Sequence, residues 1–167
     1  MIPDPGARGR ILAALHAAVA PSLFDHLVET GLLPEGHKAV ARTRDEWELF
    51  ALYACVRGLV AAAGFGPGTA EAIDAFHLQV LEAWVTGGAT LEEVRERRDR
   101  MKERYEEYGA LARDGGASGA KDLSRRLGLA AARHMTGAEP APDLAELAGA
   151  LHESLAEGAA AALAVSE

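Results

Sequence analysis

Hydrophobic residues recur every three or four positions along most of the chain, a spacing typical of amphipathic helices. No stretch alternates apolar and polar residues in the manner of a half-buried strand. Glycine and proline clusters separate the periodic segments, and Pro21 should break or kink the first of them. The pattern predicts six helices, at about 8–30, 44–63, 69–86, 90–112, 120–135 and from 143 onward.

Apolar side chains cover nearly the whole circumference of the segment 44–63. Such a helix is normally surrounded by others, so this one should lie at the centre of the bundle. Ala54, Gly58 and Ala62 recur every four residues along it and form a smooth stripe. A neighbouring helix should be able to approach closely along this stripe.

Three pairs of residues have the spacing of a capping box, in which a hydroxyl or carboxylate and a carboxylate three residues later satisfy backbone donors. Each pair predicts the start of a helix. The pairs are Thr43 with Glu46, Thr90 with Glu93, and Asp143 with Glu146.

Between residues 91 and 112 the apolar positions follow alternating steps of three and four, interrupted by Arg98. This heptad seam has two interpretations: the helix packs on the bundle through it, or it pairs with a second copy of the chain. Tyr105 and Tyr108 suit an interface because their rings are apolar and their hydroxyls are polar. We expect a homodimer, without assigning its surface.

Together these elements predict an all-α protein: a single-domain helical bundle over residues 1–167, built around the buried helix 44–63. Segment 114–119 contains three glycines and is the predicted flexible loop. Abundant Ala and Leu favour helices, and aromatic residues make up only 5% of the chain, so the core should be mainly aliphatic.

The net charge of −8 disfavours nucleic acid or an anionic membrane as the main partner, because phosphate binding needs a cationic face. The basic residues are mostly Arg, which together with abundant Ala and Gly suggests a GC-rich bacterial genome. Residues 8–20 faintly resemble a signal peptide, but His16 interrupts the apolar run and Pro21 would follow the cleavage point. The apolar run 49–65 carries Arg57 at its centre, which argues against a membrane span. We therefore expect a cytoplasmic location.

The single cysteine, Cys55, allows no intrachain disulfide, and its apolar surroundings predict a buried, inert thiol. Segment 115–121 has the length of a phosphate-binding loop but lacks the second glycine and a preceding strand. No Gly-x-Ser-x-Gly motif is present. These observations favour a protein that is not an enzyme.

Four polar residues on the predicted central region form the main candidate site. Arg57 lies midway along the central helix, where a buried guanidinium needs a partner, and Asp74 and Glu82 are the nearest acids in the next helix. His77 shares a helix face with Asp74. A polar cavity of Arg57, Asp74, His77 and Tyr105 would bind a small ligand; the alternative is a structural ion pair with His77 beside it.

A divalent metal is a further hypothesis for the same region. His26 and Glu29 are three residues apart on the first helix, as Asp74 and His77 are on the third, and two such helices could meet around an ion. The order His-x-x-Glu is reversed relative to the motif of di-iron bundles, so the match is poor.

Segment 120–135 resembles part of a helix-turn-helix, with Leu127-Gly128-Leu129 as the turn and three arginines nearby. DNA binding through it is the weakest of three functional hypotheses. The leading one is a non-enzymatic protein-interaction module that acts as a homodimer. The second is a small-ligand- or metal-binding bundle, with or without catalysis, centred on Asp74 and His77 with Arg57.

Overall fold

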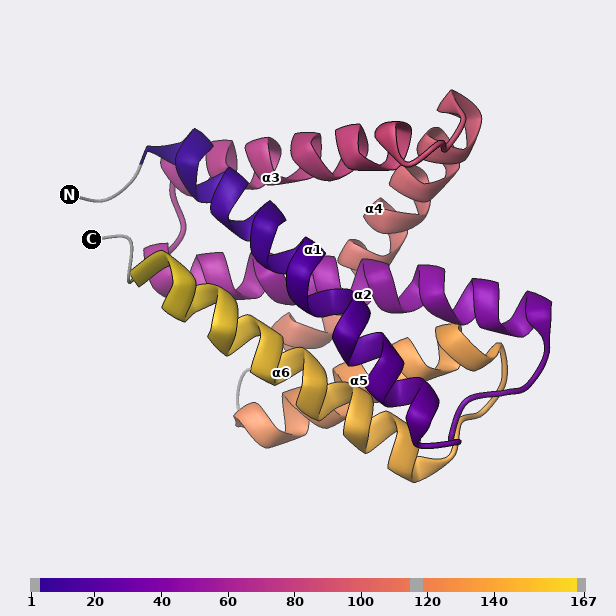
Figure 1. Cartoon of the computed structure of the whole chain (residues 1–167). Coiled ribbons are helices and arrows are strands. Elements are labelled where there is room, and N and C mark those ends of the chain that lie inside the picture. The colour runs from indigo at the N-terminus through magenta and orange to yellow at the C-terminus, as the bar shows by residue number, and fades with distance from the viewer. Residues whose placement is uncertain (1–3, 115–118, 165–167) are drawn as a thin grey trace.

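The computed structural model describes residues 4–114 and 119–164. They form six helices, and within this part of the chain there is no strand, so the predicted all-α class is confirmed (Figure 1). The helices are α1 (Pro5–Glu29), α2 (His37–Ala63), α3 (Pro67–Thr86), α4 (Leu91–Asp114), α5 (Ala120–Thr136) and α6 (Pro142–Ala164). Of the predicted flexible loop, residues 115–118 lie outside the described part of the chain.

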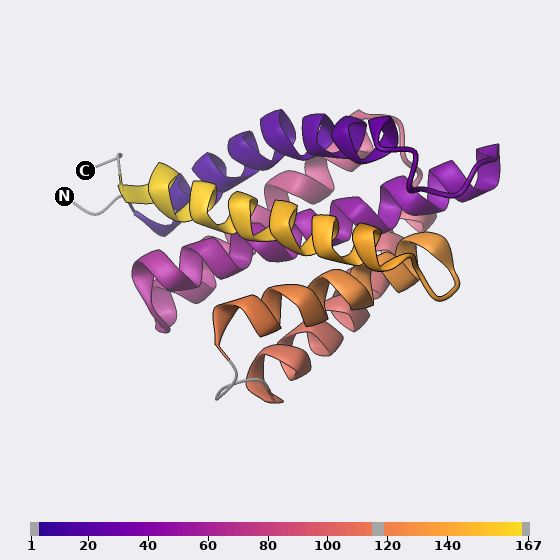
Figure 2. The same ribbon diagram turned by 90° about the horizontal axis from the view of Figure 1, so that it is seen from below.

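Helix α2 is the centre of the bundle, as its apolar circumference predicts. It packs against each of the other five helices. Figure 2 shows α1 on one side of it and the α4–α5 pair on the other. The side chains of Phe50, Leu52 and Leu59 on α2 are fully buried. The first turn of α1 and the last turns of α6 lie at the same end of the molecule (Figure 1).

The capping box predicted at Thr43 and Glu46 is wrong, because α2 begins at His37, after Gly36 with a positive φ of 112°. Thr43 Oγ1 instead donates a hydrogen bond of 2.9 Å to the backbone oxygen of Met135 on α5, and Glu46 is paired with a residue of α4. Both side chains are buried. Thr43 and Glu46 therefore serve contacts between helices and do not mark a helix start.

The other two predicted starts have different outcomes. At Thr90 the capping box is confirmed: Glu93 N donates to Thr90 Oγ1 at 3.2 Å, and Thr90 N donates to Glu93 Oε2 at 2.7 Å. Helix α6 begins at Pro142, so Asp143 lies within the first turn and does not precede it. Proline suits this position because the first turn of a helix leaves its N–H groups without partners. Pro21 lies inside α1 without ending it.

Close approaches between helices occur at glycines. A Cβ atom added to Gly58 would overlap the backbone oxygen of Ala156 and lie 2.6 Å from Ala159 Cβ, so α2 and α6 nearly touch there. This confirms the approach predicted along the Ala54–Gly58–Ala62 stripe. Helices α5 and α6 meet in the same way at Gly128 and Gly149.

Helix α1 meets α3 by the same device at Gly9, where an added Cβ would lie 2.6 Å from Ala75 Cβ. Among the described residues, α1 is also the one helix long and apolar enough to cross a membrane; buried helices of globular proteins and signal sequences meet the same criterion. In this bundle Leu12, Phe24 and Leu27 of α1 are buried.

The heptad seam of α4 packs on the bundle. Met101 and Tyr108 are buried, and α4 contacts α2, α3 and α5. At the beginning of the seam Leu91 remains 77% exposed, and Arg98, the polar intrusion, is also exposed. The seam is therefore used mainly inside one chain. Because most of the seam is buried within the chain, the seam does not support the expected homodimer.

Candidate functional site

The four residues of the predicted polar cavity do not converge on one site. Arg57 pairs with Glu153 on α6, with 2.9 Å between Nη1 and Oε2, and not with Asp74 or Glu82. Glu153 is 96 residues further along the chain, so sequence proximity could not identify it. The Arg57 side chain is 22% exposed and that of Glu153 is 33% exposed. This ion pair explains how the guanidinium of Arg57 is accommodated in the apolar part of α2.

The structure does bring His77 and Tyr105 together. His77 Nε2 lies 3.0 Å from Tyr105 Oη, and Asp74 stays exposed. Burial lowers the pKa of His77, and the charge of Asp74 opposes this effect. Burial also raises the pKa of Tyr105 well above its usual value. A neutral imidazole bonded to a neutral phenol connects α3 to α4. The structural alternative placed His77 beside the ion pair of Arg57, whereas its hydrogen-bond partner is Tyr105.

Tyr105→Phe should lower the free energy of unfolding by about 1 kcal/mol, because it removes this half-buried hydrogen bond and keeps the ring. Tyr53→Phe is the matched control, since the Tyr53 hydroxyl makes no hydrogen bond within the described residues. Urea denaturation of both variants measures the difference. Equal stability of the two variants would show that the bond contributes nothing.

No metal centre is found where the sequence suggested one. His26 and Glu29 are exposed near the end of α1. Within the described residues, no group of three or more His, Cys, Asp or Glu side chains lies close enough together to hold an ion. Cys55 is fully buried, as predicted, and burial raises its thiol pKa to about 12, so it is not a thiolate ligand at neutral pH.

The helix-turn-helix interpretation of residues 120–135 fails at its turn. Helix α5 runs without interruption through Gly128, which gives α6 room to approach at Gly149 and does not reverse the chain. Arg125 and Arg126 both pair with Asp122. The segment therefore lacks the two-helix geometry that reads a DNA groove.

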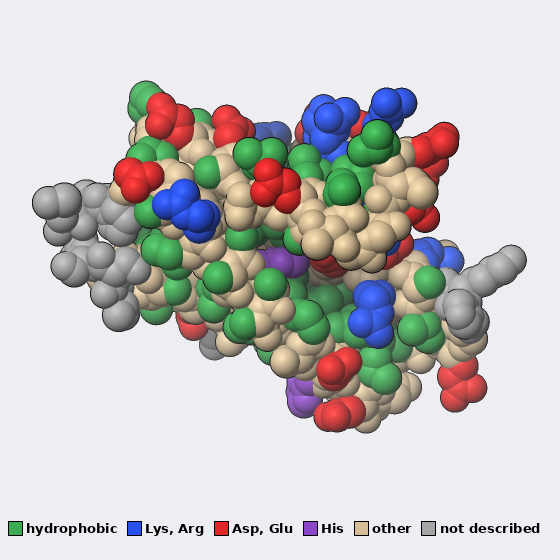
Figure 3. Space-filling view, turned by 45° about the horizontal axis from the view of Figure 1, so that its top comes forward, with side chains coloured by type: hydrophobic (Ala, Val, Ile, Leu, Met, Phe, Trp, Pro, Cys, Tyr) green, Lys and Arg blue, Asp and Glu red, His purple; other side chains and the backbone are tan. Residues whose placement is uncertain are grey.

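A pocket that sequence analysis missed lies between α1, α2 and α3, and we call it the aromatic pocket. Its volume is about 270 Å³, and three large aromatic side chains line it: Phe24, Trp47 and Trp84. The other lining residues are Ala13, His16, Ala17, Ala20, Pro21, Arg44, Glu48, Gln79, Val80 and Ala83. The face in Figure 3 is hollowed, with hydrophobic side chains around the hollow.

Hydrogen bonds fix the two indole rings of the aromatic pocket. Trp47 Nε1 donates to the backbone oxygen of Ala20 at 2.9 Å, and Trp84 Nε1 donates to Glu48 Oε1 at 2.7 Å. The guanidinium carbon of Arg44 lies 4.6 Å from the centre of the Phe24 ring. With their polar atoms already bonded, the rings present apolar faces in fixed positions, which is the usual lining of a preformed ligand pocket.

His16 is one of four polar residues that line this pocket, with Arg44, Glu48 and Gln79. The residue is 7% exposed, and its Nε2 is buried without a hydrogen-bond partner in the described part of the chain. Burial lowers the pKa of His16 to about 4, partly opposed by a backbone contact with Glu48. The imidazole is therefore neutral at pH 7. A buried nitrogen without a partner costs about 1–3 kcal/mol, and a bound ligand that reached it would recover part of this.

Acidification should destabilise the protein through His16. The pKa of His16 is about 4 in the folded chain and 6.5 in the unfolded chain. Below pH 6.5 the unfolded chain therefore binds more protons than the folded chain, and the free energy of unfolding decreases as the pH is lowered. Between pH 7 and pH 5 this group accounts for a loss of about 2 kcal/mol.

Denaturant unfolding of the wild type and of His16→Leu at both pH values measures the effect. On acidification from pH 7 to pH 5, His16→Leu should lose about 2 kcal/mol less unfolding free energy than the wild type. His26→Gln, at an exposed histidine of the same helix, is the matched control. Parallel pH dependence of the wild type and His16→Leu would contradict the assignment.

The residues of the aromatic pocket come from three helices, so no single periodic segment of the sequence contains the site. Trp47 and Trp84 are the only tryptophans of the chain, and their convergence was the one signal that could have indicated a site.

Fold and site together define a six-helix bundle with an aromatic-walled pocket. Comparisons with protein-family models, with curated proteins and with solved structures found no match to this chain.

Proposed function

We propose that this protein binds a small, uncharged ring compound in the aromatic pocket and does not transform it chemically. The observation that carries the proposal is a pocket lined by Phe24, Trp47 and Trp84. His16 also lines it, and the buried Nε2 of this residue has no hydrogen-bond partner in the described part of the chain. Aromatic faces with a small number of polar groups are the common composition of a small-molecule site. The proposal keeps the ligand-binding hypothesis and moves its centre from Asp74 and His77 to His16.

The size and charge of the pocket limit the ligand. A volume of about 270 Å³ is near the lower end for small-molecule pockets, which favours one or two fused rings. Arg44 stacks on Phe24, and Glu48 accepts a hydrogen bond from Trp84, so the two charged groups of opposite sign are already engaged. A neutral ligand with one ring nitrogen therefore fits better than an ion.

Calorimetric titration with benzimidazole and with indene tests the proposal, because the two probes share a shape and only benzimidazole has nitrogens. We expect benzimidazole to bind at least tenfold more tightly than indene. Both tryptophans line the pocket, so quenching of intrinsic fluorescence should follow the same isotherm. Absence of benzimidazole binding at millimolar concentration would reject the proposal.

Two variants locate the binding. Trp84→Ala should weaken benzimidazole binding at least tenfold, and Ala17→Leu should do so by filling the pocket without removing a core side chain. Phe65→Ala is the control, because Phe65 is 93% exposed and outside this pocket. Unchanged affinity in both pocket variants would place the site elsewhere.

The homodimeric interaction module remains a second proposal, in the cytoplasm of a bacterium as the sequence led us to expect. Leu78 and Val85 support it: they are 55% and 46% exposed and lie seven residues apart, on one face of α3. Light scattering should give twice the chain mass, and Leu78→Glu should shift it to that of the monomer. A monomer in the wild-type protein would remove this proposal.

A further inference from the structure

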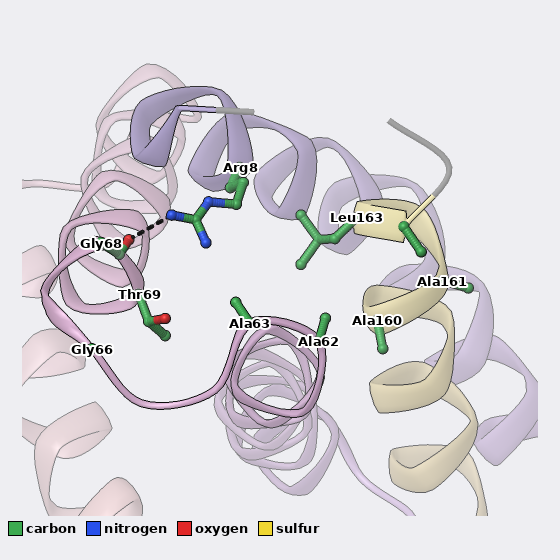
Figure 4. A pocket seen from close by; sticks show the side chains of 10 residues that line it. Arg8, Ala62, Ala63, Gly66, Gly68, Thr69, Ala160, Ala161 and Leu163 are labelled. Atoms are coloured by element: carbon green, nitrogen blue, oxygen red, sulfur yellow. Dashed lines mark hydrogen bonds between the residues drawn. The ribbon is translucent and has the colours of Figure 1, made fainter. Parts of the chain in front are cut away.

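A second cavity lies at the end of the bundle where α1 begins and α6 ends (Figure 4). Its volume is about 700 Å³, and it shares no lining residue with the aromatic pocket. Alanine and leucine side chains of α2 and α6, with the backbone of Gly66 and Gly68 at the beginning of α3, form most of the lining. Among the described residues that line it, Arg8 is the only one with a charge.

The charge of Arg8 is buried without a matching carboxylate among residues 4–114 and 119–164. The residue is 9% exposed, and no acidic side chain of the described residues lies within 4.0 Å of its guanidinium. Its Nη2 donates to the backbone oxygen of Gly68 at 3.0 Å, and its Nε is buried without a partner. The other arginines held inside the bundle have acids: Arg57 has Glu153 and Arg104 has Glu46. An unmatched buried charge is costly, so a counter-ion from outside the chain would be stabilising here.

The beginning of α3 adds positive potential at the same place. Helix α3 starts at Pro67, has no acidic residue in its first turn and has no side-chain hydrogen bond at its N-cap Gly66. The amide end of a helix carries a partial positive charge that favours anions. Figure 4 shows the Arg8 side chain reaching from α1 to this turn, beside Gly68 and Thr69. Two sources of positive charge therefore face a cavity whose other walls are aliphatic.

We propose that this cavity binds a small carboxylate with a short aliphatic chain. One guanidinium and one helix terminus match a single negative charge, whereas a phosphate dianion would leave a charge without a partner among alanine side chains. The aliphatic walls formed by Ala62, Ala63 and Leu163 would cover the chain of such a ligand. This site is independent of the aromatic pocket and of the ring compound proposed for it.

Calorimetric titration with sodium hexanoate, with 1-hexanol as the uncharged control, tests the proposal. We expect hexanoate to bind at least tenfold more tightly than hexanol, with an affinity that falls as salt is added. Hexanoate should still bind when benzimidazole saturates the aromatic pocket, at least as tightly as without it, so that failure of one site is distinguishable from failure of the other. Hexanol binding as tightly as hexanoate, or no hexanoate binding at 10 mM, would overturn the proposal.

Variants of two neighbouring arginines provide the matched comparison. Arg8→Gln should weaken hexanoate binding at least tenfold, whereas Arg10→Gln, at an exposed arginine two residues away on α1, should not. Ala63→Leu should also abolish binding by filling the cavity. If both cavity variants bind hexanoate as the wild type does, the proposal is wrong.

Two further measurements separate a ligand site from a structural role. An Arg8 that binds an external anion should be dispensable for folding, so without ligand the Tm of Arg8→Gln should equal or exceed that of the wild type. A large fall in Tm would assign Arg8 to the anchoring of α3 and contradict the proposal. A variant that ends at Ala164 should retain hexanoate binding; loss of binding there would equally contradict it.

Discussion

Replacement of Glu46 by alanine should lower the free energy of unfolding by about 3–5 kcal/mol. Both carboxylate oxygens of Glu46 accept hydrogen bonds from Arg104, at 2.8 and 2.9 Å. The side chains are 5% and 16% exposed, so the pair connects α2 to α4 with little access to water. Removing the carboxylate leaves a largely buried guanidinium whose remaining acid is the exposed Glu103, at 4.0 Å between Nη1 and Oε2. Removing one partner of a buried ion pair is strongly destabilising.

Urea denaturation monitored by circular dichroism measures the effect of Glu46→Ala. The double variant Glu46→Met with Arg104→Met removes both charges and should recover most of the lost stability. Two apolar side chains of similar volume then replace the buried ion pair, and no charge is left inside the protein without a partner. Glu139→Ala, which breaks the exposed pair with Arg133, should match the wild type within error. A loss no larger than that of Glu139→Ala would show that Glu46 and Arg104 are solvated in solution.

The second large effect is expected at Gly58. Gly58→Ala should lower the free energy of unfolding by about 3 kcal/mol, at the upper end for over-packing, because a backbone oxygen and not a flexible side chain occupies the space of the new methyl group. Helices α2 and α6 would have to separate, and the Arg57–Glu153 ion pair that joins them would lengthen.

Gly158→Ala is the matched control for Gly58→Ala. Gly158 lies in α6 with nothing within 4 Å of an added Cβ. There the substitution should raise stability by about 0.5–1 kcal/mol, the usual gain of alanine over glycine inside a helix. The two variants make the same chemical change and should have opposite signs in one denaturation assay. A gain in stability at both positions would show that the close contact at Gly58 is absent in solution.

The features that could be predicted from the sequence are those determined by residues close together in the chain. Helical periodicity and glycine or proline punctuation identified all six helices, and the small-residue stripe around Gly58 indicated a close helix contact. The Thr90–Glu93 capping box was correct because its two partners are three residues apart. The same spacing failed at Thr43 and Glu46, where each side chain contacts a helix more than fifty residues away.

The candidate site needed contacts that periodicity does not encode. Periodicity shows which face of each helix turns inward, but not which neighbour that face meets. Arg57 was identified as a charge that needs a partner, yet Glu153 was out of reach of any local pattern. Trp47 and Trp84 lie on two different predicted helices, and their meeting in one pocket with His16 depends on how α1, α2 and α3 cross. Arg8, in the first turns of α1, gave no sequence signal because an unmatched charge is recognised only once burial is known.

Helix α1 contributes lining residues to both cavities. Arg8 belongs to one site and His16 and Phe24 belong to the other. Helix α1 is held to α3 at Gly9 and to α2 by the bond from Trp47 to Ala20. Any excursion that lifts α1 from these contacts opens both cavities at once. Occupancy of either would favour the docked helix, slow the escape of the other ligand and so make the two binding events positively cooperative.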